Sequence, residues 1–167
     1  KTDTNGNSFS LYLGKAPGKG GMGLPEYTVY MNNGEVINAV IKRPKLSTSL
    51  DTWSQEVKGT LDAAKFSDGN PHIIKPLAAG DDFLILETGI DALQLKETLS
   101  HVTFDEYLTL YNDQLSAQSL FFKNDVYHGD IKGANIFTWK DKSGNRISKI
   151  ADNSPISFEE SLNLIAE

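Results

Sequence analysis

Near its C-terminal end, the sequence contains a short polar loop whose residue types suit phosphoryl transfer. Residues 128–135 read His-Gly-Asp-Ile-Lys-Gly-Ala-Asn, which places an aspartate five positions before an asparagine. The Asp130 carboxylate could orient an attacking hydroxyl and accept its proton, and the Asn135 amide oxygen could bind Mg²⁺. Lys132 would offset negative charge in the transition state, and His128 would support the loop. The alternative without function is a polar turn that follows a helix.

A second candidate is the glycine-dense segment Gly-Lys-Gly-Gly-Met-Gly at residues 18–23. Glycines let the backbone approach phosphates without a Cβ in the way, so the candidate nucleotide ligands are Gly18, Gly20, Gly21 and Gly23. A flexible loop or a Rossmann fingerprint would have the same sequence. A Rossmann fingerprint opens a helix, whereas these glycines stand between two predicted strands. This context favours a glycine-rich lid over the phosphates of a nucleotide.

Three further charged residues follow in an order that suits the same chemistry. Lys42 ends the apolar stretch Ala-Val-Ile-Lys and could contact the α- and β-phosphates, or it could be a surface lysine with a buried stem. Glu56 lies on the face of a predicted helix and is expected to pair with Lys42, with Glu35 as the weaker alternative. Asp152 follows a predicted strand and could bind metal together with Asn135, or it could belong to an Asp-Asn turn.

Hydrophobic periodicity assigns these residues to alternating strands and helices. We expect strands at residues 10–13, 27–31, 36–42, 73–77, 83–87, 137–139 and 147–151. Helices are expected at 48–64, after Ser49 or Asp51 as the cap, and at 104–122. In the second helix an apolar face is supplied by Tyr107, Leu108, Tyr111, Leu115 and Leu120. The element order predicts an α+β fold.

The composition narrows the possible partners. The chain has 167 residues, of which 39% are hydrophobic and 23% charged, which suits one domain or two small lobes. Its net charge of −6 argues against a nucleic-acid partner. It contains no cysteine, which excludes thiolate metal sites, and no apolar run is long enough to span a bilayer. We expect a monomer, and because the chain begins at Lys1, a longer product that could carry a secretion signal.

In this order the glycines, Lys42, Glu56, the polar loop and Asp152 resemble the eukaryotic-type protein kinase superfamily over about residues 11–152. The resemblance implies a single minimal kinase domain at residues 9–167. It would be bilobal, with a β-rich N-lobe at about residues 9–88 and a reduced helical C-lobe at about residues 89–167. It implies ATP and Mg²⁺ as cofactors, bound between the lobes. The backbone of Glu87 and Gly89 would then hydrogen-bond the adenine edge, next to Leu86 as the gatekeeper.

The sequence also departs from the kinase pattern. Gly129 stands where protein kinases usually carry an arginine that binds a phosphate on the activation loop, so we expect no control by such phosphorylation. The metal-binding triplet reads Asp-Asn-Ser at residues 152–154, without the usual Phe and Gly. The chain is therefore expected to be either a truncated kinase or a minimal one.

Minimal kinases of this kind resemble the HopBF-type effectors that bacterial pathogens inject through type III secretion. That resemblance implies a virulence factor secreted into the host cytoplasm. It would phosphorylate Ser or Thr of a host protein, the ninety-kilodalton heat-shock chaperone. One alternative is a small-molecule kinase of the aminoglycoside type, which also carries His-Gly-Asp but usually lacks a lysine like Lys132. The other is a pseudokinase that only binds, against which the presence of Lys42, Asp130, Asn135 and Asp152 argues.

Overall fold

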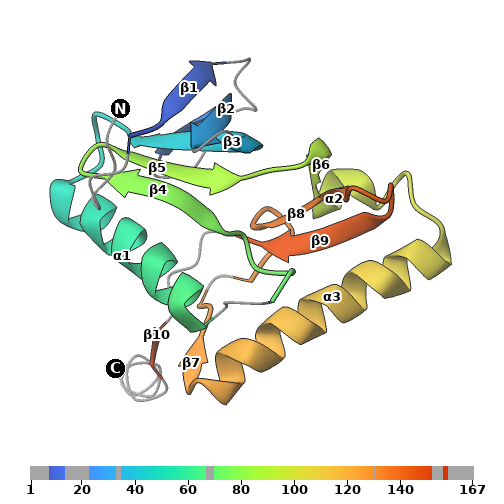
Figure 1. The fold of residues 1–167 in the computed structure, drawn as a ribbon. Coiled ribbons are helices and arrows are strands. Elements are labelled where there is room, and N and C mark those ends of the chain that lie inside the picture. The colour runs from blue at the N-terminus through green and yellow to red at the C-terminus, as the bar shows by residue number, and fades with distance from the viewer. Residues whose placement is uncertain are drawn as a thin grey trace. The chain divides into compact units, whose positions relative to one another are not determined.

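The computed structural model describes residues 8–13, 23–32, 35–66, 70–129, 131–151 and 156–157. The chain divides into two compact units (Figure 1), Lys1–Val57 with Lys75–Gly89, and Lys58–Ile74 with Ile90–Glu167. The first unit ends at Gly89, next to the lobe boundary that the sequence predicts, whereas residues 58–74 group with the second unit. The bilobal arrangement of a kinase stays a prediction.

A five-stranded antiparallel sheet forms most of the first unit. Its strands lie in the order β1-β2-β3-β5-β4. They are β1 (Ser10–Leu13), β2 (Gly23–Asn32), β3 (Glu35–Pro44), β4 (Pro76–Gly80) and β5 (Phe83–Glu87). Apolar side chains from four of these strands and from Phe9 pack into one core: Phe9, Tyr30, Ala39, Ile41, Ala78, Phe83 and Ile85.

The strand predicted at residues 73–77 lies further along the chain, because its first residues pair elsewhere. Ile73 bridges Ile150 in the parallel sense, and the Ile74 N–H donates to the Ile150 carbonyl at 2.9 Å. β4 therefore begins at Pro76. The other predicted strands of this unit are confirmed within a few residues at each end.

Helix α1 (Leu50–Phe66) starts after Ser49, one of the two caps that the sequence left open. The Ser49 Oγ accepts the Thr52 N–H at 3.1 Å, which satisfies one of the unpaired N–H groups of the first turn. One side of the helix is buried, and it consists of Trp53, Glu56, Thr60 and Ala63. Their spacing of three or four residues is that of a helix face. Residues up to Val57 belong to the first unit and those from Lys58 to the second.

The second unit combines a long helix with short strands. A three-stranded antiparallel sheet runs in the order β6-β8-β9, and β7 pairs with β10. The elements are β6 (Ile90–Gln94), α2 (Leu95–Thr98), α3 (Phe104–Lys123), β7 (Val126–Tyr127), β8 (Ile136–Lys140), β9 (Arg146–Ile150) and β10 (Ile156–Ser157). α3 lies along β9 (Figure 1). The hydrophobic core of the second unit contains Ala63, Ile73, Ala117, Phe121, Ile136 and Ile150.

The core uses a different face of α3 from the apolar face that the sequence suggested. The buried residues of the helix are Leu110, Gln114, Ala117 and Phe121. The expected face is largely exposed, since Tyr107, Leu108, Tyr111 and Leu115 are 40% to 52% accessible to solvent. Only Leu120 of that set packs partly against the core.

The described elements form a mixed α+β structure with small antiparallel sheets, in agreement with the predicted fold class. The strands β8 and β9 and the helix α3 were predicted, whereas β6 and α2 were not. Within the described ranges, no helix has the length and apolar character needed to cross a membrane.

Candidate active site

Lys42 and Glu56 form a buried ion pair between β3 and α1, within the first unit. The Lys42 Nζ donates a hydrogen bond to the Glu56 Oε1. The two side chains are 11% and 3% exposed. The structure thus brings together the lysine and the glutamate that the sequence paired, although they are 14 residues apart.

Local structure explains how these two charges come to be buried. Lys42 is near the end of β3, between β2 and β5, where Pro25 and Leu84 are its neighbours across the sheet. Glu56 lies on the buried face of α1, three residues after Trp53. Burying two charges has a large desolvation cost that their attraction only partly offsets. A buried pair of this kind therefore suggests a role other than stability.

The Glu56 carboxylate binds Lys42 through one of its two oxygens, Oε1. The Glu56 Oε2 is buried and has no hydrogen-bond partner within the described part of the chain. A carboxylate that holds a lysine fixes the position of the ammonium group, which suits it to contact phosphate oxygens. The residue types therefore fit the phosphate end of a nucleotide.

The glycine segment connects two strands, as the sequence predicted. β1 pairs with β2 in the antiparallel sense, and Gly23 is the first residue of β2, opposite Pro44. Gly18, Gly20 and Gly21 lie outside the described residues. Because Gly23 begins a strand, the arrangement is not that of a Rossmann fingerprint, in which the glycines open a helix.

In the polar loop, the backbone explains one departure from the kinase pattern. Gly129 has a φ of 78°, a left-handed conformation that strains residues with a Cβ. An arginine at this position would therefore be strained in this backbone. Lys132 is exposed, and its carbonyl accepts the Asn135 N–H at 2.8 Å, which closes a tight turn.

Asn135 is held beside the residue that precedes Asp152. The Asn135 carbonyl accepts the Ala151 N–H at 2.8 Å, because β8 and β9 pair from Ile136 and Ile150 onward. The Ala151 carbonyl is 2.9 Å from the His128 Nε2, which must carry the hydrogen since a carbonyl only accepts. The backbone thus joins the loop that carries Asn135 to the segment that leads into Asp152.

Asp130 and Asp152 themselves lie outside the described residues, so their roles stay predictions. Among the described residues, no three His, Asp or Glu side chains are grouped so that they could hold a metal ion. Asn135 is only 5% exposed, and its amide oxygen is of a type that Mg²⁺ accepts as a ligand. Of the two predicted metal ligands, Asn135 and Asp152, the structure therefore describes only Asn135.

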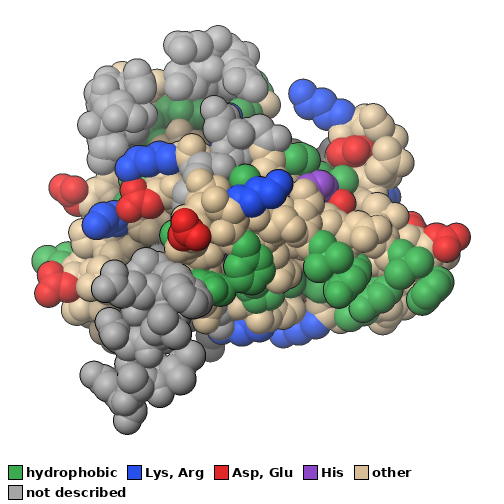
Figure 2. Space-filling model, turned by 90° about the horizontal axis from the view of Figure 1, so that it is seen from below, with side chains coloured by type: hydrophobic (Ala, Val, Ile, Leu, Met, Phe, Trp, Pro, Cys, Tyr) green, Lys and Arg blue, Asp and Glu red, His purple; other side chains and the backbone are tan. Residues whose placement is uncertain are grey.

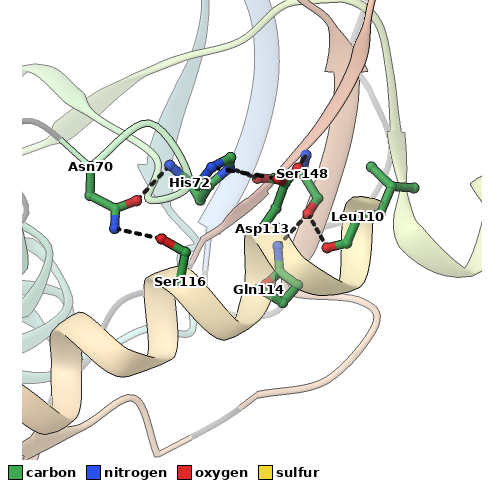
Figure 3. A network of polar contacts seen from close by, with 7 residues as sticks. All are labelled: Asn70, His72, Leu110, Asp113, Gln114, Ser116 and Ser148. Carbon is green, nitrogen blue, oxygen red and sulfur yellow. Dashed lines mark hydrogen bonds and ion pairs between the residues drawn. The ribbon is translucent and has the colours of Figure 1, made fainter. Parts of the chain in front are cut away.

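A polar network anchors the β8-β9 hairpin to α3 and to the loop before β4 (Figure 3). Ser148 is its centre: its N–H donates to Asp113 at 2.9 Å and its hydroxyl donates to the Leu110 carbonyl at 2.9 Å. That hydroxyl accepts from the Gln114 Nε2 at 2.6 Å, and the Ser148 carbonyl is 3.2 Å from the His72 Nδ1. These contacts fix the strand that leads to Ala151.

Two members of this network, His72 and Asp113, lie close enough for an ion pair. The His72 Nε2 is 3.5 Å from the Asp113 Oδ1. Burial raises the pKa of Asp113 above its ordinary value of 3.8, although the Ser148 N–H and nearby His72 act in the opposite direction. No motif marked Asp113, Gln114 or Ser148 as positioning residues, because only the fold brings α3 and β9 together.

The predicted adenine-binding backbone lies at the end of β5. The Glu87 N–H donates to the Lys75 carbonyl at 3.0 Å, and the Glu87 Oε1 accepts the Lys75 N–H at 2.9 Å. A contact from Glu87 to an adenine amine would therefore use its carbonyl oxygen. Gly89 follows the strand and is half-buried.

Comparison with known proteins points to the same kind of fold. No protein-family model matches the chain. Among curated proteins, it is similar to cell division control protein 7 of Schizosaccharomyces pombe, with 30% identity over 143 residues. That relative is a serine/threonine protein kinase. The similarity indicates a kinase-like fold. The aligned region takes in 82% of this chain but only 13% of the relative.

Proposed function

We propose that this chain is an ATP-dependent protein kinase that transfers the γ-phosphoryl group to a Ser or Thr hydroxyl of a protein. The observation that carries the proposal is the buried Lys42–Glu56 pair. Kinases need a strand lysine held by a helix glutamate to contact the nucleotide phosphates. The similarity to a serine/threonine kinase supports kinase activity in general.

The residues divide the reaction between them. Asp130 accepts the proton of the hydroxyl as its oxygen forms a bond to the γ-phosphorus, while the bond from that phosphorus to the β-γ bridging oxygen breaks and ADP leaves. Lys132 offsets the charge that develops. Asn135 and Asp152 would hold Mg²⁺, which when bound neutralises phosphate charge.

Labelling with radioactive ATP tests the activity directly. The purified chain is incubated with Mg²⁺ and labelled ATP, with a mixture of acceptor proteins in one arm and aminoglycosides in another. We expect label in protein, loss of label in Lys42→Met, and full labelling in the control Lys142→Met, whose side chain lies in the exposed turn between β8 and β9. Label in the aminoglycoside arm alone would replace the proposal by a small-molecule kinase, and no label in either arm would favour a pseudokinase.

We also propose, on sequence resemblance alone, that the chain is a bacterial effector of the HopBF type. It would act in the host cytoplasm on the ninety-kilodalton heat-shock chaperone. The test compares this purified chaperone with a general acceptor such as casein at equal concentration. Preferential labelling of the chaperone is expected, and equal or weaker labelling would refute the effector proposal while leaving the kinase proposal intact.

A further inference from the structure

An exposed apolar stripe runs along the whole of α3. Its members recur at helical spacing and are between 40% and 72% exposed: Phe104, Tyr107, Leu108, Tyr111, Leu115 and Phe122. Figure 2 looks at this side of the molecule and shows hydrophobic side chains gathered in a row. Phe104 and Phe122 are 18 residues apart, or five helical turns of about 3.6 residues, so they lie on the same face.

The stripe is distinct from the face that the core requires. The core takes Leu110, Gln114, Ala117 and Phe121, about a quarter turn away at 3.6 residues per turn. Four of the six stripe residues are Tyr or Phe, which are enriched at protein interfaces. Tyr107 and Tyr111 already stack on each other, with ring centroids 6.4 Å apart. A contiguous patch of this kind is typical of an interaction surface.

The charges beside the stripe favour a second copy of the same helix. Asp105 lies in the first turn and Lys123 in the last, again 18 residues apart and hence on the same flank. Between them this flank carries the uncharged Asn112, Ser116 and Ser119. In an antiparallel pair of helices related by a two-fold axis, each flank faces itself in the opposite direction. Asp105 then faces the partner's Lys123, whereas in a parallel pair this flank would lie against the partner's opposite flank.

The apolar residues match when the axis lies at Asp113, one residue earlier than the axis at Gln114 that relates the charges, a shift of about 1.5 Å along the helix that long side chains can span. Phe104 then faces the partner's Phe122 and Tyr111 faces the partner's Leu115. Four half-exposed aromatic rings and two leucines offer on the order of 500 Å² per copy. Two copies would bury about 1,000 Å², the lower bound for a specific interface.

We propose that α3 mediates a weak, antiparallel homodimer through this stripe. The inference differs from the monomer expected from the sequence, and it does not depend on phosphoryl transfer. Weak, transient interfaces lie at this small end of the size range, so sedimentation equilibrium should cover about 1 µM to about 1 mM. A monomer over that whole range would overturn the proposal.

Two variants test the position of the interface. Tyr111→Glu places an unpaired charge at the centre of the stripe twice per dimer, so no dimer should form. Because Tyr111 is 52% exposed, the variant should fold, which circular dichroism checks. Leu46→Glu, which changes a fully exposed leucine outside the stripe, is the matched control and should dimerise normally. Equal association of all three proteins would overturn the proposal.

A charge exchange tests the antiparallel register. Asp105→Lys and Lys123→Asp should each raise the dimer dissociation constant by about fivefold, because an exposed pair is worth little but occurs twice. The double variant exchanges the two charges and should return to within about twofold of the original affinity. If the double variant dimerises more weakly than either single variant, the α3 helices of two copies do not pair in this antiparallel register.

Discussion

Replacing Glu56 by leucine should destabilise the first unit strongly. The partner charge on Lys42 would stay buried, since its side chain is only 11% exposed. Breaking a buried ion pair from one side costs about 3–5 kcal/mol, a large share of the roughly 5–15 kcal/mol that stabilises a typical domain. Lys42→Met should have a similar effect, because it leaves the Glu56 carboxylate without its cation.

The double variant Lys42→Met/Glu56→Leu should recover most of this loss. It replaces both charges by apolar side chains of similar volume, which is often neutral or even stabilising. Because the Glu56 Oε2 already lacks a partner within the described residues, removing the carboxylate also removes an unsatisfied buried acceptor. We therefore expect the double variant within about 1 kcal/mol of the original protein, and a coupling energy of several kcal/mol. Phosphoryl transfer should remain abolished.

Urea unfolding followed by tryptophan fluorescence measures these differences. The chain has two tryptophans, and a Trp139→Phe background leaves Trp53, which is buried on α1 one turn from Glu56, as the reporter. Lys142→Met, which removes an exposed lysine, is the control and should change nothing. If the double variant loses as much unfolding free energy as the two single variants together, Lys42 and Glu56 do not stabilise each other. The buried ion pair would then be refuted. A stable double variant that retains activity would refute the catalytic role of the pair.

Four further predictions concern the second unit. Asp152→Ala should abolish phosphoryl transfer by loss of Mg²⁺, while Asp130→Ala should cripple transfer and leave ATP binding nearly intact; equal loss of ATP affinity in titration calorimetry would contradict these roles. Burial raises the pKa of Asp113, so its contribution to stability is fully present below pH 3.8 and is lost as the pH rises through the raised pKa. The unfolding free energy of the original protein minus that of Asp113→Asn should fall over this range in urea titrations, whereas the exposed control Asp125→Asn should show no such trend. Gly129→Ala should cost about 1–2 kcal/mol in thermal unfolding because of the left-handed backbone, and phosphatase treatment should leave the activity of the original protein unchanged, since Gly129 offers no charge to a phosphate.

The sequence alone predicted most of the local structure around the candidate site. Alternating and apolar runs identified β1, β2, β3, β5, β8 and β9, because the period of side chains along a strand is visible in the chain itself. The predicted order of strands places the glycines between β1 and β2. It also places Lys42 near the end of β3. Helical spacing placed Glu56 on the face of α1, and the kinase pattern supplied its pairing with Lys42.

Only the tertiary structure decided which residues the second unit buries. α3 carries two candidate faces, and the sequence favoured the stripe that includes Tyr107 and Tyr111 because it is the more hydrophobic. The core instead takes the face with Gln114, whose amide donates to Ser148 on β9. A polar residue becomes acceptable in a core when the fold supplies its partner, and such a partner 34 residues away leaves no periodic signal.

The same limit applies to the elements and conformations that the sequence missed. β6 depends on pairing with β8, and Thr98 of α2 is buried where its hydroxyl contacts Thr138 of β8 at 2.7 Å. The positive φ of Gly129 is a property of the folded loop. Periodicity and motif spacing therefore determined the order of the elements and the chemistry of the candidate residues. Long-range partners determined what is buried, because burial depends on groups that are distant in the chain.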